Sequence, residues 1–246
     1  MPLELLQIIS GIGIIVFIVI ALFIGLLIIL AYFEFKESIL LYIGLTWIAL
    51  ILPYVPSAIN FIMYILSGAI LPDRVCFIIG LSFSPVGFTC WIAAITELMY
   101  PRLKKSIIII SIIYGLAFEL VFFYYVIVNP SIIGMVISPV DIEYRTFVVV
   151  YIIIDLGILL ITGVKLGLGS MKNENEEAKL KGKLHIIAWI LYVGGALFDG
   201  ILPLTLVTIL IVRIILILSS IAFYGSFLLP NWMRSIFIRK KFVDYL

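Results

Sequence analysis

The chain has 246 residues, of which 65% are hydrophobic and 12% are charged, and its formal net charge is +2. A soluble domain of this length could not bury so much apolar side chain, since most of its surface would then be apolar. Several apolar runs also exceed the roughly 18 residues that mark a membrane-spanning helix. The composition therefore excludes a soluble globular protein and predicts an all-α integral membrane protein.

Seven membrane-spanning helices fit the apolar pattern. The first segment, MPLELLQIISG, lacks the basic region of a cleaved signal peptide, so we expect this helix to be retained. The predicted spans are 8–33, 39–66, 76–99, 106–128, 146–166, 184–198 and 203–229. Residues 184–229 are too long for one helix, and FDGILP, with Asp199 and Gly200, offers the turn between the last two.

The second and third spans carry prolines at mid-helix. Pro53 and Pro56 remove backbone hydrogen bonds from the second span, and Pro85 does so in the third. Such breaks are tolerated where other groups or water satisfy the freed backbone. A cavity is one explanation, and its candidate lining residues are Trp47, Tyr54, Asn60, Thr89, Trp91 and Asp199. The alternative is close helix packing through small residues.

Ionisable residues inside the spans form a second candidate site. Arg213 interrupts the aliphatic run IVRIILIL about 15 Å below the start of its span, near the middle of the bilayer. Asp155 and Glu119 lie at a similar depth in the fifth and fourth spans. We expect Arg213 to pair with Asp155, with Glu119 as a second acceptor or a separately protonated acid. The cluster either serves function or only fixes helix packing.

The basic residues predict the orientation of the chain in the membrane. Most of the 16 Lys and Arg residues fall in segments that lie inside if the N-terminus is outside. Because inner loops are enriched in Lys and Arg, we expect an outer N-terminus and an inner C-terminus. Residues 230–246 mix aromatic and basic side chains, which is typical of a basic amphipathic juxtamembrane tail at anionic headgroups.

Two inner segments, 97–105 and 165–183, are candidates for docking a cytosolic partner together with this tail. For the charged segment 171–183 the alternative is an ordinary solvated loop. For the tail it is anchoring to the bilayer. The lipid bilayer itself is an expected partner, and nucleic acid is not.

Motifs for catalysis and cofactor binding are missing from the sequence. Its one histidine, His185, cannot supply a multi-histidine metal site, and no HExxH, GxSxG or P-loop occurs. The seventh span has no lysine for a retinal Schiff base, and FDG is not the Gly-x-Gly-Asp pattern of intramembrane aspartyl proteases. We therefore expect no catalytic residues, no metal and no cofactor. His185 is expected at the inner edge of the sixth span.

The order of the seven spans and the inner exits MYPRLKK and LLPNWMRSIF carry a family resemblance. The chain resembles the seven-helix membrane modules of prokaryotes that include the N-terminal sensory regions of some histidine kinases. This resemblance implies a sensor of a ligand or of the state of the membrane. We expect no output domain after Leu246, so such a sensor would signal through a separate cytosolic partner.

The sequence therefore predicts a receptor- or sensor-like module that binds a small or apolar ligand in an outward-opening pocket closed below. One alternative is a 3+1+3 transporter or channel, because the third and seventh spans both exit through a proline followed by basic residues. That reading requires a cavity between the two triple-helix halves, with Asn60 and Asp155 facing it. Another alternative is an accessory protein that packs against partner helices and has no cavity.

Overall fold

The computed structural model describes residues 3–201 and 205–238. Within these ranges, seven helical segments are long and apolar enough to cross a membrane, as the hydropathy pattern predicted. We number them spans 1 to 7, and their bounds are Leu5–Phe35, Ser38–Ser67, Asp73–Met99, Pro101–Val128, Thr146–Met171, Glu176–Ile201 and Leu206–Phe227. The structure therefore supports a multi-pass, mainly α-helical membrane protein, to which a short β-hairpin adds two strands that the all-α expectation did not include.

Spans 1, 4, 5, 6 and 7 each contain one long helix. These helices are α1 (Leu5–Phe35), α6 (Lys104–Val128), α7 (Thr146–Met171), α8 (Glu176–Ile201) and α9 (Leu206–Phe227), and the 3-10 turn η2 (Pro101–Leu103) precedes α6. Helix α8 begins well before the predicted residue 184. Its charged first turns are stabilised by a Lys179–Glu176 ion pair of 2.8 Å and by Lys181, whose Nζ donates to the Phe227 carbonyl at 2.9 Å.

Spans 2 and 3 are each built from two helical pieces. Span 2 consists of α2 (Ser38–Ile51), the 3-10 turn η1 (Leu52–Tyr54) and α3 (Val55–Ser67), and span 3 of α4 (Asp73–Leu81) and α5 (Ser84–Met99). Pro53, Pro56 and Pro85 are the second residues of η1, α3 and α5, respectively. Proline is tolerated there because the first turn of a helix does not use its N–H groups. The helix breaks therefore lie where the prolines predicted them.

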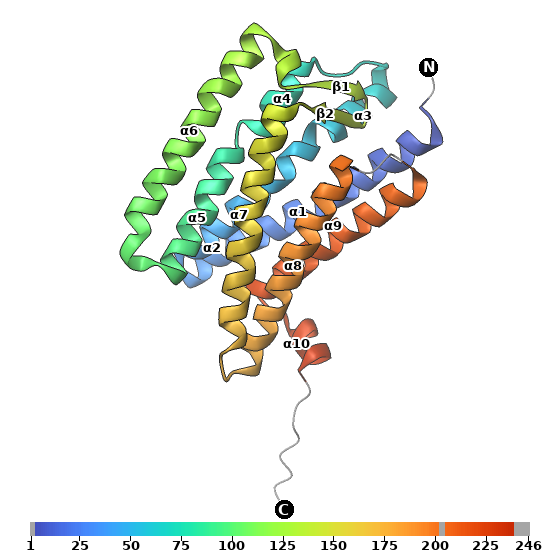
Figure 1. Cartoon of the computed structure of the whole chain (residues 1–246). Helices are drawn as coiled ribbons and strands as arrows, with labels where there is room; N and C mark the ends of the chain where they lie inside the picture. Colours follow the sequence, from blue (N-terminus) through green and yellow to red (C-terminus); the bar gives the residue numbers. More distant parts are fainter. Residues whose placement is uncertain (1–2, 202–204, 239–246) are drawn as a thin grey trace, which may run out of the picture.

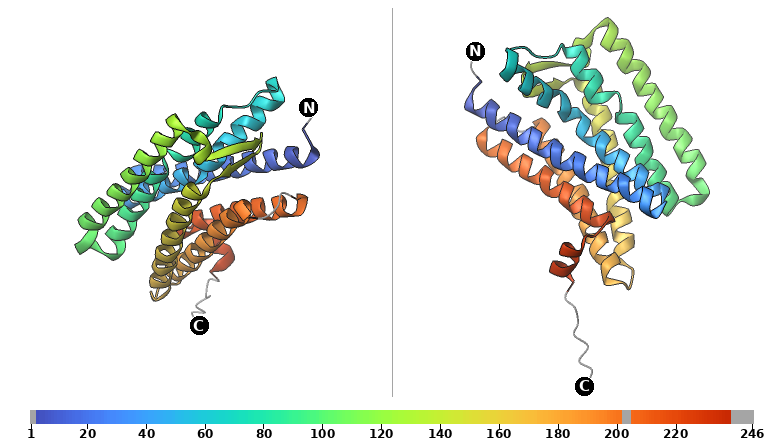
Figure 2. Two further views of the ribbon diagram at one scale, coloured as in Figure 1. Left: turned by 45° about the horizontal axis from the view of Figure 1, so that its top comes forward. Right: turned by 180° about the vertical axis from the view of Figure 1, so that it is seen from behind.

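The seven spans form a ring in which chain neighbours are also neighbours in space (Figure 1). Helix α1 packs against α2 and α9, so the first and last spans close the ring, and α8 lies between α7 and α9. On the opposite side, α6 meets α7 through aromatic side chains: Phe118 stacks on Tyr151 with ring centroids 3.7 Å apart. Figure 2 shows the same arrangement from two further directions.

A short antiparallel hairpin covers one end of the ring (Figure 1). It consists of β1 (Gly134–Ser138) and β2 (Asp141–Tyr144), follows the 3-10 turn η3 (Pro130–Ile132), and joins α6 to α7. We call this the hairpin end. The α7–α8 connection and the short helix α10 (Asn231–Phe237) lie at the other, which we call the α10 end.

Helix α10 is the described part of the predicted basic tail. Met233 is buried and packs close to Gly225 of α9, while Arg234 forms an exposed 2.9 Å ion pair with Glu177 of α8. The tail thus begins as a helix held against the bundle. Residues 239–246, which contribute most of its predicted basic charge, lie outside the described residues.

Aromatic side chains fill the half of the ring nearer the α10 end. Trp47 stacks on Phe223 with centroids 3.9 Å apart, and Trp91 meets Trp189 edge-on at 4.5 Å. His185 is buried among them. Its Nε2 accepts a hydrogen bond from Trp189 Nε1 at 3.2 Å, and its Nδ1 lies 3.2 Å from the Ser226 hydroxyl. We call Trp47, Trp91, His185, Trp189 and Phe223 the aromatic floor.

The burial of His185 adds to what the sequence predicted. The sequence placed this residue at the inner edge of span 6, and its ring packs against Phe227, the last residue of α9, with Nδ1 3.2 Å from the Ser226 hydroxyl. Only 4% of the residue is exposed, so its side chain faces the interior of the bundle at this end. Its depth in the membrane stays a prediction.

Candidate functional site: a cavity beneath the hairpin

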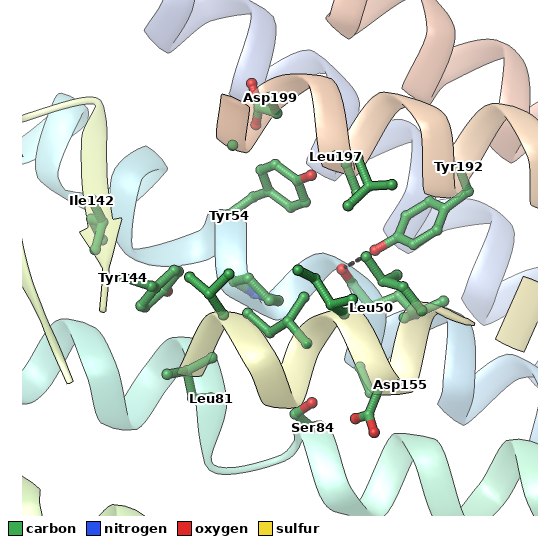
Figure 3. A pocket seen from close by; sticks show the side chains of 18 of the residues that line it. Leu50, Tyr54, Leu81, Ser84, Ile142, Tyr144, Asp155, Tyr192, Leu197 and Asp199 are labelled. Carbon is green, nitrogen blue, oxygen red and sulfur yellow. Dashed lines mark hydrogen bonds between the residues drawn. The ribbon is translucent and has the colours of Figure 1, made fainter. Parts of the chain in front are cut away.

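A cavity of about 270 Å³ lies inside the ring, in the half nearer the hairpin end (Figure 3). Most of its wall is aliphatic or aromatic, with contributions from α1, α2, α5, α7, α8, α9 and β2. Its ionisable lining residues are Tyr54, Asp141, Tyr144, Asp155, Tyr192, Asp199 and Arg213. An apolar wall with a few convergent polar groups is typical of a small-molecule site.

The cavity occupies only part of the depth of the bundle. On α7 its lining runs from Val149 to Leu159, and on α8 from Tyr192 to Ile201. These are the portions of both helices toward the hairpin end. Below them lies the aromatic floor, in which Trp47, Trp91 and Trp189 are fully buried. The cavity is therefore confined to one half of the bundle.

Spans 1 to 3 and spans 5 to 7 both line the cavity. The first group contributes residues such as Ile14, Leu50 and Phe88, and the second contributes Leu156 and Leu197. From the hairpin, Val140, Asp141, Ile142 and Tyr144 also line it. Strand β2 is consequently part of the cavity wall and not only a connection between α6 and α7.

Arg213 and Asp199 form the first polar group of the cavity. Arg213 NH1 donates to Asp199 Oδ2 at 3.0 Å, and the two side chains are 7% and 20% exposed, respectively. The guanidinium also faces the ring of Tyr54, with 5.6 Å between Arg213 Cζ and the ring centroid. A cation over an aromatic face is attractive, and more so when it is removed from water.

The predicted pairing of Arg213 with Asp155 is therefore wrong. Side chains on a helix tilt toward its N-terminus, which for α9 lies at the hairpin end. Arg213 accordingly extends toward the C-terminal turns of α8, where Asp199 stands. Helix α8 also separates α9 from α7, the helix that carries Asp155. Arg213 and Asp155 were paired because they lie at similar depths in their spans. Depth alone does not show which helices are neighbours in the bundle.

Asp155 is the second polar group and is almost completely buried. Its exposure is 6%, and its Oδ1 accepts a hydrogen bond from the Tyr114 hydroxyl of α6 at 3.1 Å. Figure 3 shows Asp155 and Ser84 on the opposite side of the cavity from Asp199. Among the described residues, no lysine, arginine or histidine forms an ion pair with it. Asp155 is thus a buried acid without a protein counter-ion.

Glu119 does not join either polar group. It is half-buried on α6, beside the face of Gly115, Phe118 and Phe122 that packs into the bundle, and it is not part of the cavity wall. Helix α6 packs mainly on α5, whereas Arg213 lies on α9. The expected role of Glu119 as second acceptor is therefore wrong.

The other predicted cavity residues divide into two groups. Tyr54 and Asp199 line the cavity. Trp47 and Trp91 belong to the aromatic floor instead, and Thr89 is a half-buried residue of α5 that is not part of the wall. Trp47 and Trp91 point into the ring as expected but fill its other half, whereas Thr89 lies on the expected helix outside the cavity wall.

Asn60 is also buried outside the cavity wall, where it organises the connection between spans 2 and 3. Its Oδ1 accepts a hydrogen bond from the Leu71 N–H at 2.8 Å, and its Nδ2 donates to Cys76 Sγ at 3.4 Å. These bonds satisfy the amide. The expectation that Asn60 faces a cavity is therefore wrong, and its role is structural.

Two residues of the hairpin were not anticipated. Burial raises the pKa of Asp141, and the nearby carboxylates of Asp199 and Glu143 raise it further. Burial also raises the pKa of Tyr144, whose hydroxyl has no hydrogen-bond partner within the described ranges. The stretch VISPVDIEYR carries a turn signal in Ser-Pro, but nothing in it indicates that the strand folds over a cavity.

Comparisons with known proteins give no relative from which a function of the site could be inferred. No family model matches the chain, and neither a curated protein nor a solved structure matches it. Across the residues described here, no three His, Cys, Asp or Glu side chains gather to hold a metal ion. The arrangement that is present, an apolar cavity with a buried ion pair on one side and a lone acid on the other, is suited to binding.

Proposed function

We propose that this chain is a receptor- or sensor-like membrane module that binds a small, largely apolar ligand beneath the hairpin. The observation that supports this most directly is the confinement of the cavity to one half of the bundle, above a packed aromatic floor. A receptor needs a pocket that opens to one side. The module acts without catalysis and passes the bound state to a cytosolic partner.

The hairpin end is the outer side in this proposal. Exposed basic residues are concentrated at the opposite end, on the connections that carry Arg102, Lys105 and Lys172, and the positive-inside rule places such connections in the cytoplasm. The cavity would then face the exterior, and α10 with the α7–α8 connection would face a partner. This arrangement matches what the resemblance to prokaryotic sensory modules implies.

Transport is the competing function, because spans 1 to 3 and spans 5 to 7 both contribute to the cavity wall. A transporter must also expose its site to the second side of the membrane. The aromatic floor opposes this, since large buried side chains at interior packing density leave no path for a solute. The floor therefore favours a receptor over a transporter.

A receptor and a transporter differ in whether the cavity can be reached from one side of the membrane or from both. In Ala196→Cys the new thiol stands in the cavity wall, whereas in Ala188→Cys it stands in the fully buried part of α8. We expect a membrane-impermeant cationic thiol reagent to modify Ala196→Cys from the hairpin side only and Ala188→Cys from neither. The unmodified chain, in which Cys76 is buried and Cys90 half-buried, gives the background.

Modification of Ala196→Cys from both sides would support transport and contradict the receptor proposal. Binding itself is tested with 1-octanol, because a cavity of about 270 Å³ holds roughly nine non-hydrogen atoms at about 30 Å³ each. Labelled 1-octanol should bind saturably to the protein in neutral-lipid nanodiscs, after subtraction of empty nanodiscs. Ala196→Trp, which fills the cavity, should abolish this binding.

A further inference from the structure

We propose that the ligand of the cavity is a monovalent organic cation with an apolar body, of the alkylammonium class, and that Asp155 is its counter-ion. This inference rests on the proposed ligand-binding function and specifies its chemistry. It follows from the charges in the cavity wall, their burial and the apolar side chains around them.

The charges of the cavity do not balance. Its described lining residues include three carboxylates, of Asp141, Asp155 and Asp199, and one basic side chain, Arg213. Arg213 forms an ion pair with Asp199, with 3.0 Å between NH1 and Oδ2. Asp141 is half-buried at the start of β2, where the hairpin meets the outer surface. Asp155 is the acid that is both deeply buried and without a basic partner.

A lone ionised carboxylate is unstable in such surroundings. Burying it costs several kcal/mol, as an order of magnitude, unless an opposite charge and further hydrogen bonds compensate. The Tyr114 hydroxyl donates a hydrogen bond to Asp155 at 3.1 Å, and the Tyr151 hydroxyl lies near the same carboxylate. Neutral hydroxyl groups offset only part of this cost. A bound ammonium group would supply the missing charge and up to three N–H donors.

Neighbouring groups suit an ammonium at this position. The Ser84 side chain lies beside Asp155 in the cavity wall (Figure 3) and offers a hydroxyl acceptor. Apolar side chains of the same wall, among them Leu50 and Leu197, lie between Asp155 and Asp199 in Figure 3. An alkyl chain would complement these apolar side chains. The head group would therefore lie at Asp155 and the chain would point toward the ion pair of Asp199.

Other ligand classes fit less well. An anion would meet the carboxylates of Asp141 and Asp155, and it would have to share the Arg213 guanidinium with Asp199. A neutral alcohol is the serious rival, because a protonated Asp155 could bind a hydroxyl without any charge on the ligand. The alkylammonium and the alcohol differ in one group, so a matched series separates them.

The experiment compares labelled 1-octylamine, 1-octanol and octanoate on the full chain in neutral-lipid nanodiscs, near neutral pH, with empty nanodiscs subtracted. We expect wild-type protein to bind the amine at least tenfold more tightly than the alcohol, and octanoate most weakly. Asp155→Asn should lose the preference for the amine and keep its affinity for 1-octanol, which also reports that the variant is folded. Glu119→Gln, a carboxyl change outside the cavity wall, should leave all three affinities unchanged.

Equal affinities for amine and alcohol in the wild type would overturn the cation proposal while leaving the cavity a ligand site. If Asp155→Asn kept the preference for the amine, Asp155 would not be the counter-ion. Failure of all three probes to bind the wild type would overturn both this inference and the proposed receptor function. The wild-type series decides the ligand class even if Asp155→Asn does not fold.

Discussion

At the scale of single residues, the direction of a side chain decides which charges meet. Arg213 starts well inside span 7, but its long side chain reaches back toward the hairpin end and ends at Asp199. The Arg213 Nε remains buried without a hydrogen-bond partner among the described residues. The guanidinium is therefore incompletely compensated, and Asp199 is the main group that stabilises it.

The first prediction concerns this ion pair. Asp199→Leu leaves a buried arginine unpaired and should lower the free energy of unfolding by about 3 kcal/mol. Arg213→Leu should cost less, roughly 1–2 kcal/mol, because Asp199 is partly exposed and can be hydrated or protonated. The double variant should be less damaged than the sum of the two, by about 1–3 kcal/mol of coupling. Denaturant unfolding in detergent measures these differences.

The control for this cycle is Asp155→Leu combined with Arg213→Leu. Because the structure gives these residues different partners, their effects should be nearly additive. Stronger coupling of Arg213 to Asp155 than to Asp199 would show that the ion pair described here is not the one that forms.

The second prediction concerns Asp141 and pH. Burial first, and then the carboxylates of Asp199 and Glu143, raise its pKa in the folded protein. The folded state therefore holds this proton at pH values where the unfolded state has lost it, so ionisation opposes folding. The stability of the wild type relative to Asp141→Asn should fall as pH rises from about 4, the usual pKa of an aspartate, through the raised value.

Thermal unfolding of both proteins at a series of pH values tests this expectation. Only the difference between them is informative, since the other carboxylates titrate in both. Glu143→Gln should shift the fall to lower pH by removing a neighbouring negative charge. A difference that is constant with pH, or that grows in favour of the wild type as pH rises, would contradict it.

At the scale of secondary-structure elements, the ring depends on close contact between neighbouring helices. Without a strong hydrophobic driving force between helices in lipid, small residues at the contacts allow the packing that holds them together. Gly163 of α7 illustrates this. It lies against the ring of Trp189 on α8, so closely that a Cβ at this position would overlap the indole. The aromatic floor thus requires a glycine on the opposing helix.

The third prediction follows from that contact. Gly163→Ala should destabilise the protein by about 1–3 kcal/mol, because either the indole or α7 must move. Gly157 on the same helix provides a matched control, since a Cβ there would meet no atom within 4 Å. Gly157→Ala should be neutral or stabilising by up to about 1 kcal/mol, as expected for alanine replacing glycine in a helix. Unfolding in detergent, followed by the fluorescence of the buried tryptophans, measures the stability of both variants.

Similar losses of stability in the two alanine variants would indicate that the packing of α7 on α8 is loose. In that case the floor beneath the cavity would not be tightly closed. The comparison therefore also bears on the choice between receptor and transporter.

At the scale of the whole molecule, the contact of α1 with α9 closes the seven spans into a ring. The closed ring surrounds an interior, and the two halves of this interior are filled differently. Aromatic side chains occupy the half nearer the α10 end, whereas the half beneath the hairpin retains the cavity. This asymmetry between the two ends of the bundle is the basis for the proposed one-sided pocket.

The fourth prediction concerns orientation. Glu143 in the hairpin and Lys172 in the α7–α8 connection are both exposed, at opposite ends of the ring. A membrane-impermeant thiol reagent should modify Glu143→Cys in intact cells, and should modify Lys172→Cys only after permeabilisation, since basic connections face the cytoplasm. The reverse pattern would place the cavity on the cytoplasmic side and exchange the two faces assigned here.

Hydropathy and proline act on the local backbone. The spans and helix breaks that they predicted are therefore present in the structure. The seven apolar segments and the breaks at Pro53, Pro56 and Pro85 could be recognised from the sequence. Lipid obliges each apolar segment to satisfy its own backbone as a helix, and proline cannot continue the hydrogen bonding of the preceding turn. Neither effect needs a partner from elsewhere in the chain.

The cavity and the charge pairs depended on the tertiary structure. Arg213, Asp155 and Glu119 could be placed at similar depths from the sequence, but depth does not specify which helices are neighbours or which way a side chain turns. The order of helices around the ring separates Arg213 from Asp155 and brings it to Asp199. Such lateral order results from the combined packing of all seven spans, and no single segment encodes it.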